Sequence, residues 1–171
     1  EKQKIISNDK TPRDLFNFYM DKGWLSIQIF FIRQARLMKR EKRLFPIVDT
    51  AVEEMTSFIL QFYNRRNNIL PREILLPKGL PNKEISEILG VPVRTPVRGE
   101  KRDLLAMAHE NAQLSLDEKF RLLEMDQSKT TGAMKEITDA LGLPEGHRIE
   151  AFDNSHIQGA DPVSAMVVFI N

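Results

Sequence analysis

Three strand-like stretches open the chain before any helix-like stretch appears, and this order limits the folds that the chain can adopt. The first covers residues 13–19 and ends at an Asp-Lys-Gly turn at 21–23. The second, 24–33, is crowded with β-branched and aromatic residues, and the third, 36–45, follows a tight turn at 34–35. Strands joined by such short turns are typical of an antiparallel meander.

Helices and strands then alternate. Residues 49–63 carry apolar side chains at helical spacing, with Asp49 or Thr50 as the N-cap. The pattern further predicts a strand at 73–76, a helix at 82–89 closed by Gly90, and a strand at 91–95. This order predicts a mixed α/β fold, with one mixed sheet and helices on both of its faces. It is also the order of a ribonuclease H-like fold.

Helical sequence follows the predicted sheet. An amphipathic helix is expected over 101–124, because apolar residues recur on one helical face. They are Leu105, Ala108, Ala112, Leu116, Phe120 and Leu123. Residues 127–141 predict a separate helix that Gly142 and Pro144 close.

The end of the chain predicts a β-hairpin that carries an unusually placed carboxylate. Its first arm alternates so that Ile149, Ala151 and Asp153 share one face, which is otherwise apolar. Residues 155–162 supply turn chemistry, and 163–170 form a nearly continuous apolar strand. A two-stranded sheet is only marginally stable, so the hairpin is expected to be the truncated start of a larger domain.

Asp153 admits two interpretations. A carboxylate on a covered apolar face loses hydration, which costs several kcal/mol unless a cation or hydrogen-bond donors replace the water. On that interpretation Asp153 is a candidate metal ligand. The alternative is a strand-end aspartate that caps a backbone group, since aspartate is uncommon inside strands.

Composition sets outer limits on function. The chain has 171 residues and a formal net charge of +1, so any affinity for nucleic acid must come from local patches of charge. It has no cysteine, which excludes a disulfide framework and a thiolate metal site. No apolar run approaches ~18 residues, so neither a membrane span nor a secretion signal is indicated.

Two groups of basic residues are candidates for such patches. The first group lies along one hairpin and comprises Arg33, Arg36, Lys39, Arg40, Lys42 and Arg43. The second lies where a strand passes into the long helix and comprises Arg94, Arg98, Lys101 and Arg102. Such residues neutralise phosphates, and the N-terminus of a helix near Lys101 also attracts a phosphate. The alternative is a solvated surface, in which cations protect a strand edge from pairing.

The hairpin residues resemble a known family. The run Glu-Ala-Phe-Asp-Asn-Ser-His from Glu150 to His156, followed by Gly159 and by Pro-Val-Ser-Ala from Pro162, is similar to the opening of the ribonuclease H-like endonuclease domain of the UvrC family. Three other segments resemble the same family: Glu1-Lys-Gln-Lys, residues 28–33 and the helix over 101–120. The resemblance therefore runs through the whole chain.

This resemblance implies an activity and partners. UvrC is the C subunit of the bacterial UvrABC excinuclease, a cytoplasmic enzyme of nucleotide excision repair that cuts damaged double-stranded DNA on both sides of a lesion. The family binds UvrB through a segment upstream of this chain, and UvrA indirectly. Its ribonuclease H-like half makes the 5′ cut by phosphodiester hydrolysis, with Mg²⁺ or Mn²⁺ held by carboxylates.

By the same resemblance, Asp153 matches the first metal-binding, catalytic aspartate of the family's site. The family's other catalytic acids and its catalytic histidine lie beyond Asn171, and one carboxylate cannot hold two metals. We therefore expect this chain alone to bind no metal and to be inactive. Ser155 could contact metal-bound water or DNA. His156 could contact a phosphate, and the alternative is a loop histidine hydrogen-bonded to the backbone.

Four segments are predicted on this basis. They are a lead-in from the UvrB-binding segment at 1–10, a noncatalytic ribonuclease H-like domain at 11–125, a helical linker at 126–146, and the start of the catalytic domain at 147–171. The first domain is expected to be noncatalytic because its strongest strand, 24–33, has no acidic residue and Asp14 and Asp21 only flank its first strand. We expect the chain to be part of a DNA-facing nuclease, and the alternative is a noncatalytic scaffold or interaction module of the repair complex.

Overall fold

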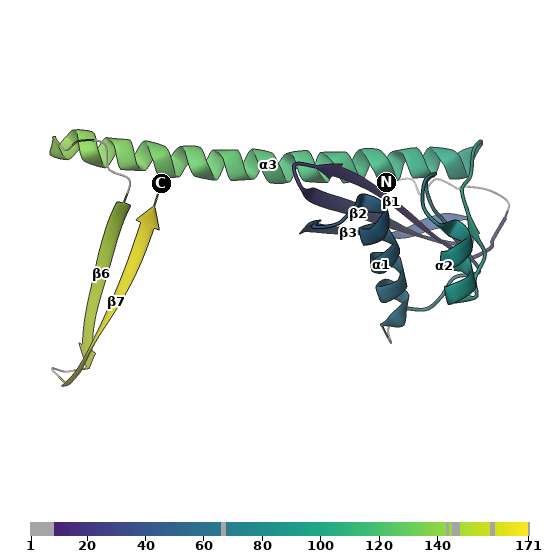
Figure 1. Ribbon diagram of the computed structural model, residues 1–171, viewed down its shortest axis with the longest axis horizontal. Helices are drawn as coiled ribbons and strands as arrows, with labels where there is room; N and C mark the ends of the chain where they lie inside the picture. The colour runs from purple at the N-terminus through teal and green to yellow at the C-terminus, as the bar shows by residue number, and fades with distance from the viewer. Residues whose placement is uncertain (1–8, 66–67, 143, 145–147, 158–159, 171) are drawn as a thin grey trace. The chain divides into compact units, whose positions relative to one another are not determined.

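The computed structural model describes residues 9–65, 68–142, 144, 148–157 and 160–170 (Figure 1). Within those ranges it leaves out the side chains at 130, 131, 154–157, 160–163 and 169. Contacts along the chain divide it into two units, Glu1–Lys119 and Phe120–Asn171. Each unit is described by itself below.

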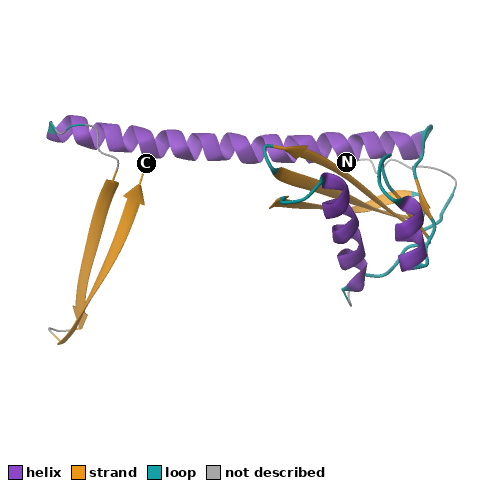
Figure 2. Cartoon of the chain, viewed as in Figure 1, coloured by secondary structure: helices purple, strands orange, loops and turns teal. Residues whose placement is uncertain are grey.

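The first unit is built on a five-stranded mixed sheet (Figure 2). Its strands are β1 (Arg13–Asp21), β2 (Trp24–Arg33), β3 (Arg36–Pro46), β4 (Glu73–Leu75) and β5 (Val93–Arg94). The spatial order is β3-β2-β1-β4-β5, with β1, β2 and β3 antiparallel and β4 and β5 running parallel to β1. The helices are α1 (Ala51–Asn64), α2 (Asn82–Leu89) and α3 (Glu100–Leu141). The predicted order of elements and the mixed α/β class are confirmed.

The meander depends on two tight turns. Lys22 and Gly23 have φ angles of 48° and 73°, and Gln34 and Ala35 have φ angles of 48° and 57°. Two consecutive residues with positive φ form the type of hairpin turn whose twist matches that of the strands. The turns fix the register, which runs from Asp21 opposite Trp24 through the whole of β1 and β2.

One face of the sheet packs against α1 and α2 (Figure 1). The core there joins strand residues such as Phe16 and Ile29 to Met55 and Ile59 of α1, all fully buried. The helix begins at Thr50, whose side chain accepts from the Glu53 backbone while the Glu53 carboxylate accepts from the Thr50 backbone. Of the two predicted caps, Thr50 is the one observed.

The other face packs against the first part of α3. Leu15, Phe30 and Ile32 of the sheet contact Leu104, Leu105 and Ala108 of the helix. The predicted apolar stripe is buried as far as Leu116, whereas Leu123 is 45% exposed. Helices therefore cover both faces of the sheet, as the element order predicted.

Two predicted boundaries are wrong. The predicted break between helices at 124–127 does not exist, because α3 is continuous from Glu100 to Leu141. The four residues there, Glu-Met-Asp-Gln, include neither Gly nor Pro, so nothing interrupts the helical hydrogen bonds. The strand predicted at 91–95 is only Val93–Arg94, since the preceding Pro92 has no N–H to donate to a neighbouring strand.

The second unit contains a two-stranded antiparallel sheet of β6 (Arg148–Ile157) and β7 (Ala160–Ile170). The predicted hairpin is confirmed, but the predicted turn at 155–162 is wrong. Pairing continues from Ser155 opposite Val163 to Ile157 opposite Ala160, with an irregular register in between. Asp161 and Pro162 are thus strand residues, and Pro is tolerated because such an irregularity relaxes the hydrogen-bonding pattern. Gly159 lies outside the described residues.

In the described part of the chain, no helix is long and apolar enough to cross a membrane.

Candidate functional site

Asp153 lies in the middle of β6, opposite Ala165 of β7. The residue is exposed, and its neighbour Phe152 and the facing Met166 are 63% and 56% exposed. The expected burial of this carboxylate is therefore wrong for the hairpin as it stands, because no further strand or helix among the described residues covers either face. Its charge is hydrated and requires no partner here.

The described residues around Asp153 do not fit a divalent cation. Mg²⁺ and similar ions take about six oxygen ligands, usually including more than one carboxylate. The structure's described residues contain no group of three or more acidic or histidine side chains placed to hold a metal. Glu150 points to the opposite face of β6 by alternation and forms an ion pair with Arg148 at 2.5 Å. Asp153 alone is thus an incomplete ligand set.

Two further predicted residues, Ser155 and His156, have their backbone in β6. Their side chains lie outside the described residues, so their predicted contacts with DNA or metal-bound water stay predictions. The side chain of another histidine, His109 of α3, is among the described residues. Its Nδ1 lies 2.8 Å from the carbonyl oxygen of Phe18, and its ring meets Tyr19 edge-on. His109 thus contacts the backbone and a side chain of β1.

The first unit holds a buried carboxylate in β1 that the sequence analysis placed only at the flank of the strand. Asp14 is the second residue of β1 and is 1% exposed. Its two oxygens accept hydrogen bonds from Arg33 at 2.7 Å and from the hydroxyl of Tyr63 at 2.8 Å. Burial raises the pKa of Asp14 above its ordinary value, although both hydrogen bonds oppose that rise. Burial and the nearby Asp14 likewise raise the pKa of Tyr63, so its hydroxyl keeps its proton and donates.

A second buried carboxylate, Glu73, begins β4 and is 7% exposed. It accepts a hydrogen bond from the buried guanidinium of Arg13, and it also pairs with Arg94 and Lys101, each at 3.3 Å. Burial alone raises the pKa of Glu73, but the hydrogen bond from Arg13 and the charge of Lys101 outweigh it and leave the pKa below its ordinary value. Glu73 therefore stays ionised.

These two carboxylates do not form a metal site together. Asp14 is paired across the strands with Ile74, whereas Glu73 is paired with Arg13. Neighbouring residues of a strand point to opposite faces, so Asp14 faces the α1 side of the sheet and Glu73 the α3 side. Each is neutralised by arginine. The first unit thus has buried carboxylates on adjacent strands without the convergence that two-metal chemistry requires.

Tyr63→Phe is expected to lower the free energy of unfolding by about 1–3 kcal/mol, because it leaves one oxygen of the buried Asp14 without its donor. Urea unfolding followed by Trp24 fluorescence measures the loss. Tyr19→Phe is the matched control, since this residue is the other tyrosine of the chain and lies at the sheet surface. Equal losses in the two variants would show that the Asp14–Tyr63 bond contributes nothing.

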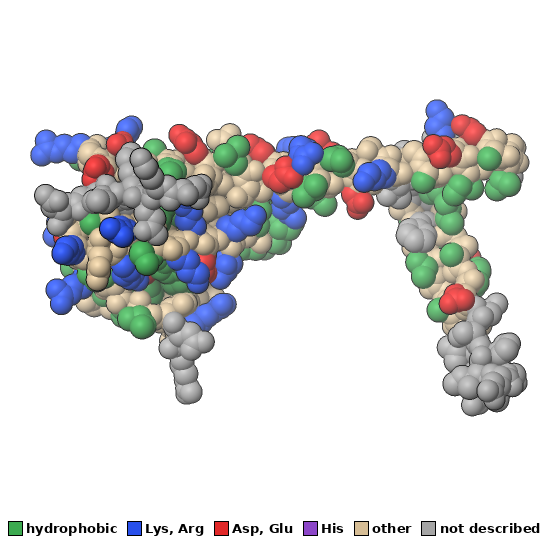
Figure 3. Space-filling view, turned by 180° about the vertical axis from the view of Figure 1, so that it is seen from behind, with side chains coloured by type: hydrophobic (Ala, Val, Ile, Leu, Met, Phe, Trp, Pro, Cys, Tyr) green, Lys and Arg blue, Asp and Glu red, His purple; other side chains and the backbone are tan. Residues whose placement is uncertain are grey.

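The first predicted basic group lies mostly on β3, which is an edge strand. Figure 3 shows many Lys and Arg side chains on the surface of the first unit. Arg40 and Lys42 are exposed and are paired with Phe30 and Gln28, so they lie on the α3 side of the sheet. The guanidinium of Arg40 lies 5.4 Å from the ring centre of Phe30. These two cations line a groove of about 570 Å³ between β3 and α3, together with Gln28, Glu41, Asn111, Leu114, Ser115 and Glu118.

Most other members of this basic group form ion pairs with carboxylates. Lys39 and Arg43, on the α1 side of β3, pair with Glu41 at 2.5 and 2.7 Å. The hydrogen bond from Lys39, followed by the charges of Lys39 and Arg43, lowers the pKa of Glu41. Arg33 is committed to Asp14, and Arg36 is exposed at the turn. Arg40 and Lys42 are therefore the members best placed to meet a phosphate.

The second basic group is partly neutralised. Arg94 and Lys101 converge on Glu73, and Arg102 pairs with Asp103 at 3.5 Å. The first turn of α3 also carries two acidic residues, which weakens the attraction of this helix N-terminus for a phosphate. Arg98 is exposed. Charge alone in the sequence could not distinguish this group from the first, because the neutralising Glu73 comes from β4.

Comparison with known proteins agrees with this architecture. Residues 12–119 match the family model of the UvrC ribonuclease H-like domain, and residues 138–171 match that of the UvrC RNAse H endonuclease domain. Over its full 171 residues the chain is 99% identical to UvrABC system protein C of Limosilactobacillus reuteri and 87% identical to that of Limosilactobacillus fermentum. It is 78% identical over 169 residues, 99% of the chain, to that of Lactiplantibacillus plantarum. It spans 28% of the length of each of these relatives. The chain belongs to the UvrC family.

Proposed function

We propose that this chain is the part of a UvrC-type nuclease subunit in which a noncatalytic, DNA-holding unit precedes the start of the catalytic ribonuclease H-like domain. The complete protein acts with UvrA and UvrB on damaged double-stranded DNA in nucleotide excision repair, in the bacterial cytoplasm. It hydrolyses phosphodiester bonds with divalent cations, and this half makes the 5′ incision. Support comes from the family membership and from the name of the relatives, UvrABC system protein C.

One observation carries the DNA-holding role of the first unit. Its two buried carboxylates, Asp14 and Glu73, lie on opposite faces of the sheet and are each neutralised by arginine, while its edge strand exposes Arg40 and Lys42. A nuclease site needs converging carboxylates, and a phosphate-binding surface needs unneutralised cations. The first unit meets only the second requirement.

Asp153 is proposed as a ligand of Mg²⁺ or Mn²⁺ in the complete domain. A hydrated carboxylate at the centre of a strand is free to join carboxylates from neighbouring strands once these are present. The remaining ligands are proposed to come from the part of the longer relatives that this chain does not cover. The chain alone is therefore proposed to be inactive, with Ser155 and His156 near the bound strand.

The salt dependence of DNA binding tests the first unit. Each duplex phosphate that a cation neutralises contributes about 0.9 to the slope of log affinity against log salt. Arg40→Gln combined with Lys42→Gln is expected to lower that slope by about 2 and to weaken binding of a 20-base-pair duplex. Fluorescence anisotropy at several salt concentrations measures both quantities.

A charge-matched control makes this test specific. Lys78→Gln combined with Lys83→Gln removes the same charge from exposed residues beside α2, which lies away from β3. An equal change of slope in both double variants would mean that only net charge matters. If the wild-type chain bound no duplex at any salt concentration, the scaffold or interaction-module hypothesis would replace the DNA-holding one.

A further inference from the structure

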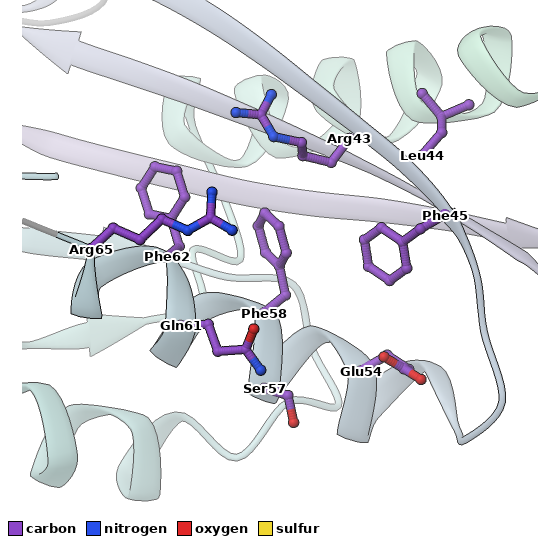
Figure 4. A pocket seen from close by; sticks show the side chains of 9 residues that line it. All are labelled: Arg43, Leu44, Phe45, Glu54, Ser57, Phe58, Gln61, Phe62 and Arg65. Carbon is purple, nitrogen blue, oxygen red and sulfur yellow. The ribbon is translucent and has the colours of Figure 1, made fainter. Parts of the chain in front are cut away.

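A second groove lies on the other side of β3, between this edge strand and helix α1 (Figure 4). Its volume is about 310 Å³, at the lower end of the ~300–1,000 Å³ range of small-molecule pockets. It is lined by Arg43, Leu44, Phe45, Glu54, Ser57, Phe58, Gln61, Phe62 and Arg65. Arg43 belongs to the first basic group, whereas Arg65 and the aromatic rings belong to neither basic group.

The aromatic part of the groove is a row of rings. Phe45 and Phe58 stack with their centroids 6.1 Å apart at 26°, and Phe58 and Phe62 lie 6.0 Å apart at 31°. Phe62 is buried in the core and fixes the row, whereas Phe45 and Phe58 are only half-buried. The row therefore presents aromatic surface of fixed orientation to a ligand in the groove.

The polar part of the groove comes from both walls. In Figure 4, Arg43 extends from β3 and Arg65 from the end of α1, over the stretch that holds Phe58 and Phe62. Arg43 is held in place by its ion pair with Glu41 at 2.7 Å and by the carbonyl oxygen of Lys42 at 2.8 Å. Arg65 is exposed. Two guanidinium groups thus lie beside the aromatic row. Arg43 is positioned and partly neutralised by Glu41, so the exposed Arg65 is the main cation available to a phosphate.

We infer that this groove binds an unpaired nucleotide of single-stranded DNA, with its base against Phe58 and an adjoining phosphate between Arg43 and Arg65. The inference rests on the proposed DNA-holding role of the first unit and assigns single-stranded DNA to this groove. Base stacking on aromatic side chains, combined with cations that follow the backbone, is the general means of binding single strands. A nucleotide uses both halves of the groove.

An acidic peptide fits the groove less well. Its carboxylates can form ion pairs with the arginines, but they provide no planar group to stack on the aromatic rings. The carboxylate of Glu54 and the amide oxygen of Gln61, which line the groove, can accept a hydrogen bond from an N–H group of a base, which in thymine is N3–H.

The test uses the 171-residue chain and a labelled oligonucleotide of eight thymidines, with a 20-base-pair duplex as the second probe. Phe58→Leu keeps an apolar side chain and removes the ring, so it is expected to weaken binding of the single strand about tenfold and that of the duplex less than twofold. Arg65→Gln is expected to lower the single-strand salt slope by about 0.7. Phe152→Leu, at an exposed phenylalanine outside the groove, is the matched control.

Each outcome decides the inference. Equal effects of Phe58→Leu and Phe152→Leu on single-strand binding would overturn the inference. It would also be overturned if Phe58→Leu weakened the binding of an acidic peptide but not that of the oligonucleotide. Persisting duplex binding through Arg40 and Lys42 would then leave the proposed function intact, whereas loss of all DNA binding would end both. If Phe58→Leu did not fold in a thermal scan, Arg65→Gln, which changes only an exposed side chain, would carry the test.

Discussion

Glu73→Gln is expected to lower the free energy of unfolding of the first unit by about 2–3 kcal/mol. The substitution keeps the shape of the side chain but removes the charge that neutralises the buried Arg13, which is 5% exposed. Arg13 then keeps its ion pair with the half-exposed Asp9, but its Nε loses the carboxylate that accepts its hydrogen bond inside the protein. Arg94 and Lys101 lose the same partner, although both reach solvent.

The size of this loss depends on pH. The pKa of Glu73 in the folded chain lies below its ordinary value, because the bond from Arg13 and the charge of Lys101 outweigh burial. The unfolded carboxylate therefore takes up a proton first as the pH falls. The stabilisation is complete above the ordinary pKa of glutamate and is lost as the pH falls through the lower folded value. The difference between wild type and Glu73→Gln is expected to shrink accordingly in acid. The pKa of Asp14 is raised, so its contribution to the pH dependence of stability has the opposite sign. That contribution is the same in the wild type and in Glu73→Gln, so it cancels in their difference.

Urea unfolding at neutral pH and at about pH 3, followed by the fluorescence of the single tryptophan, Trp24, measures both effects. Asp103→Asn is the control, because it also neutralises a carboxylate paired with arginine but its side chain is 70% exposed. Exposed pairs contribute about 0–1 kcal/mol. A loss for Glu73→Gln no larger than that of Asp103→Asn would contradict the prediction, as would a difference that grows in acid.

The sequence predicts the frame of the fold well because its signals are local. Strand β2 coincides with the predicted 24–33 stretch, since β-branched and aromatic residues fill it between two turns. Helix α2 begins and ends where its pattern and Gly90 place it, and Gly90 adopts a φ of 68° that suits glycine. In each case the residues that decide the structure lie next to one another.

The internal networks are not predictable in this way. Asp14 meets Arg33 across 19 residues and Tyr63 across 49. Alternation assigns each residue a face of the sheet but not the partner that the sheet order brings to it. A polar residue within an apolar strand was the available signal for Asp14, and a charged residue opening a short buried strand was the signal for Glu73. Both signals indicate that the carboxylate needs a hydrogen-bond or ion-pair partner, but they do not identify that partner.

The exposure of Asp153 has a different cause. Alternation correctly places it within a strand, but the predicted burial depends on further strands that the described residues do not supply. An apolar face in the sequence shows what a strand is suited to contact, and the surroundings decide whether that contact exists. The hairpin therefore has residues that are typical of a buried sheet, although many of their side chains are exposed to solvent.

Asp153→Ala is expected to reduce strand cutting by the full-length protein about a thousandfold. A metal ion at the scissile phosphate contributes several kcal/mol of transition-state stabilisation, and each ~1.4 kcal/mol corresponds to a tenfold change in rate. The measurement is a nicking assay on damaged duplex DNA with Mn²⁺, in the presence of the other subunits. The 171-residue chain is expected not to cut, since its described residues include no group of acidic side chains able to hold an ion.

Asp139→Ala in the same full-length protein is the control, because Asp139 is an exposed aspartate that belongs to α3 and not to a hairpin strand. Cutting by the full-length wild type and by Asp139→Ala, but not by Asp153→Ala, places Asp153 among the metal ligands. Equal cutting by full-length wild type and Asp153→Ala would show that the catalytic role assigned to this residue is wrong. Cutting by the 171-residue chain that Asp153→Ala abolishes would show that its own residues complete the ligand set, and a scaffold role for the chain would then be untenable.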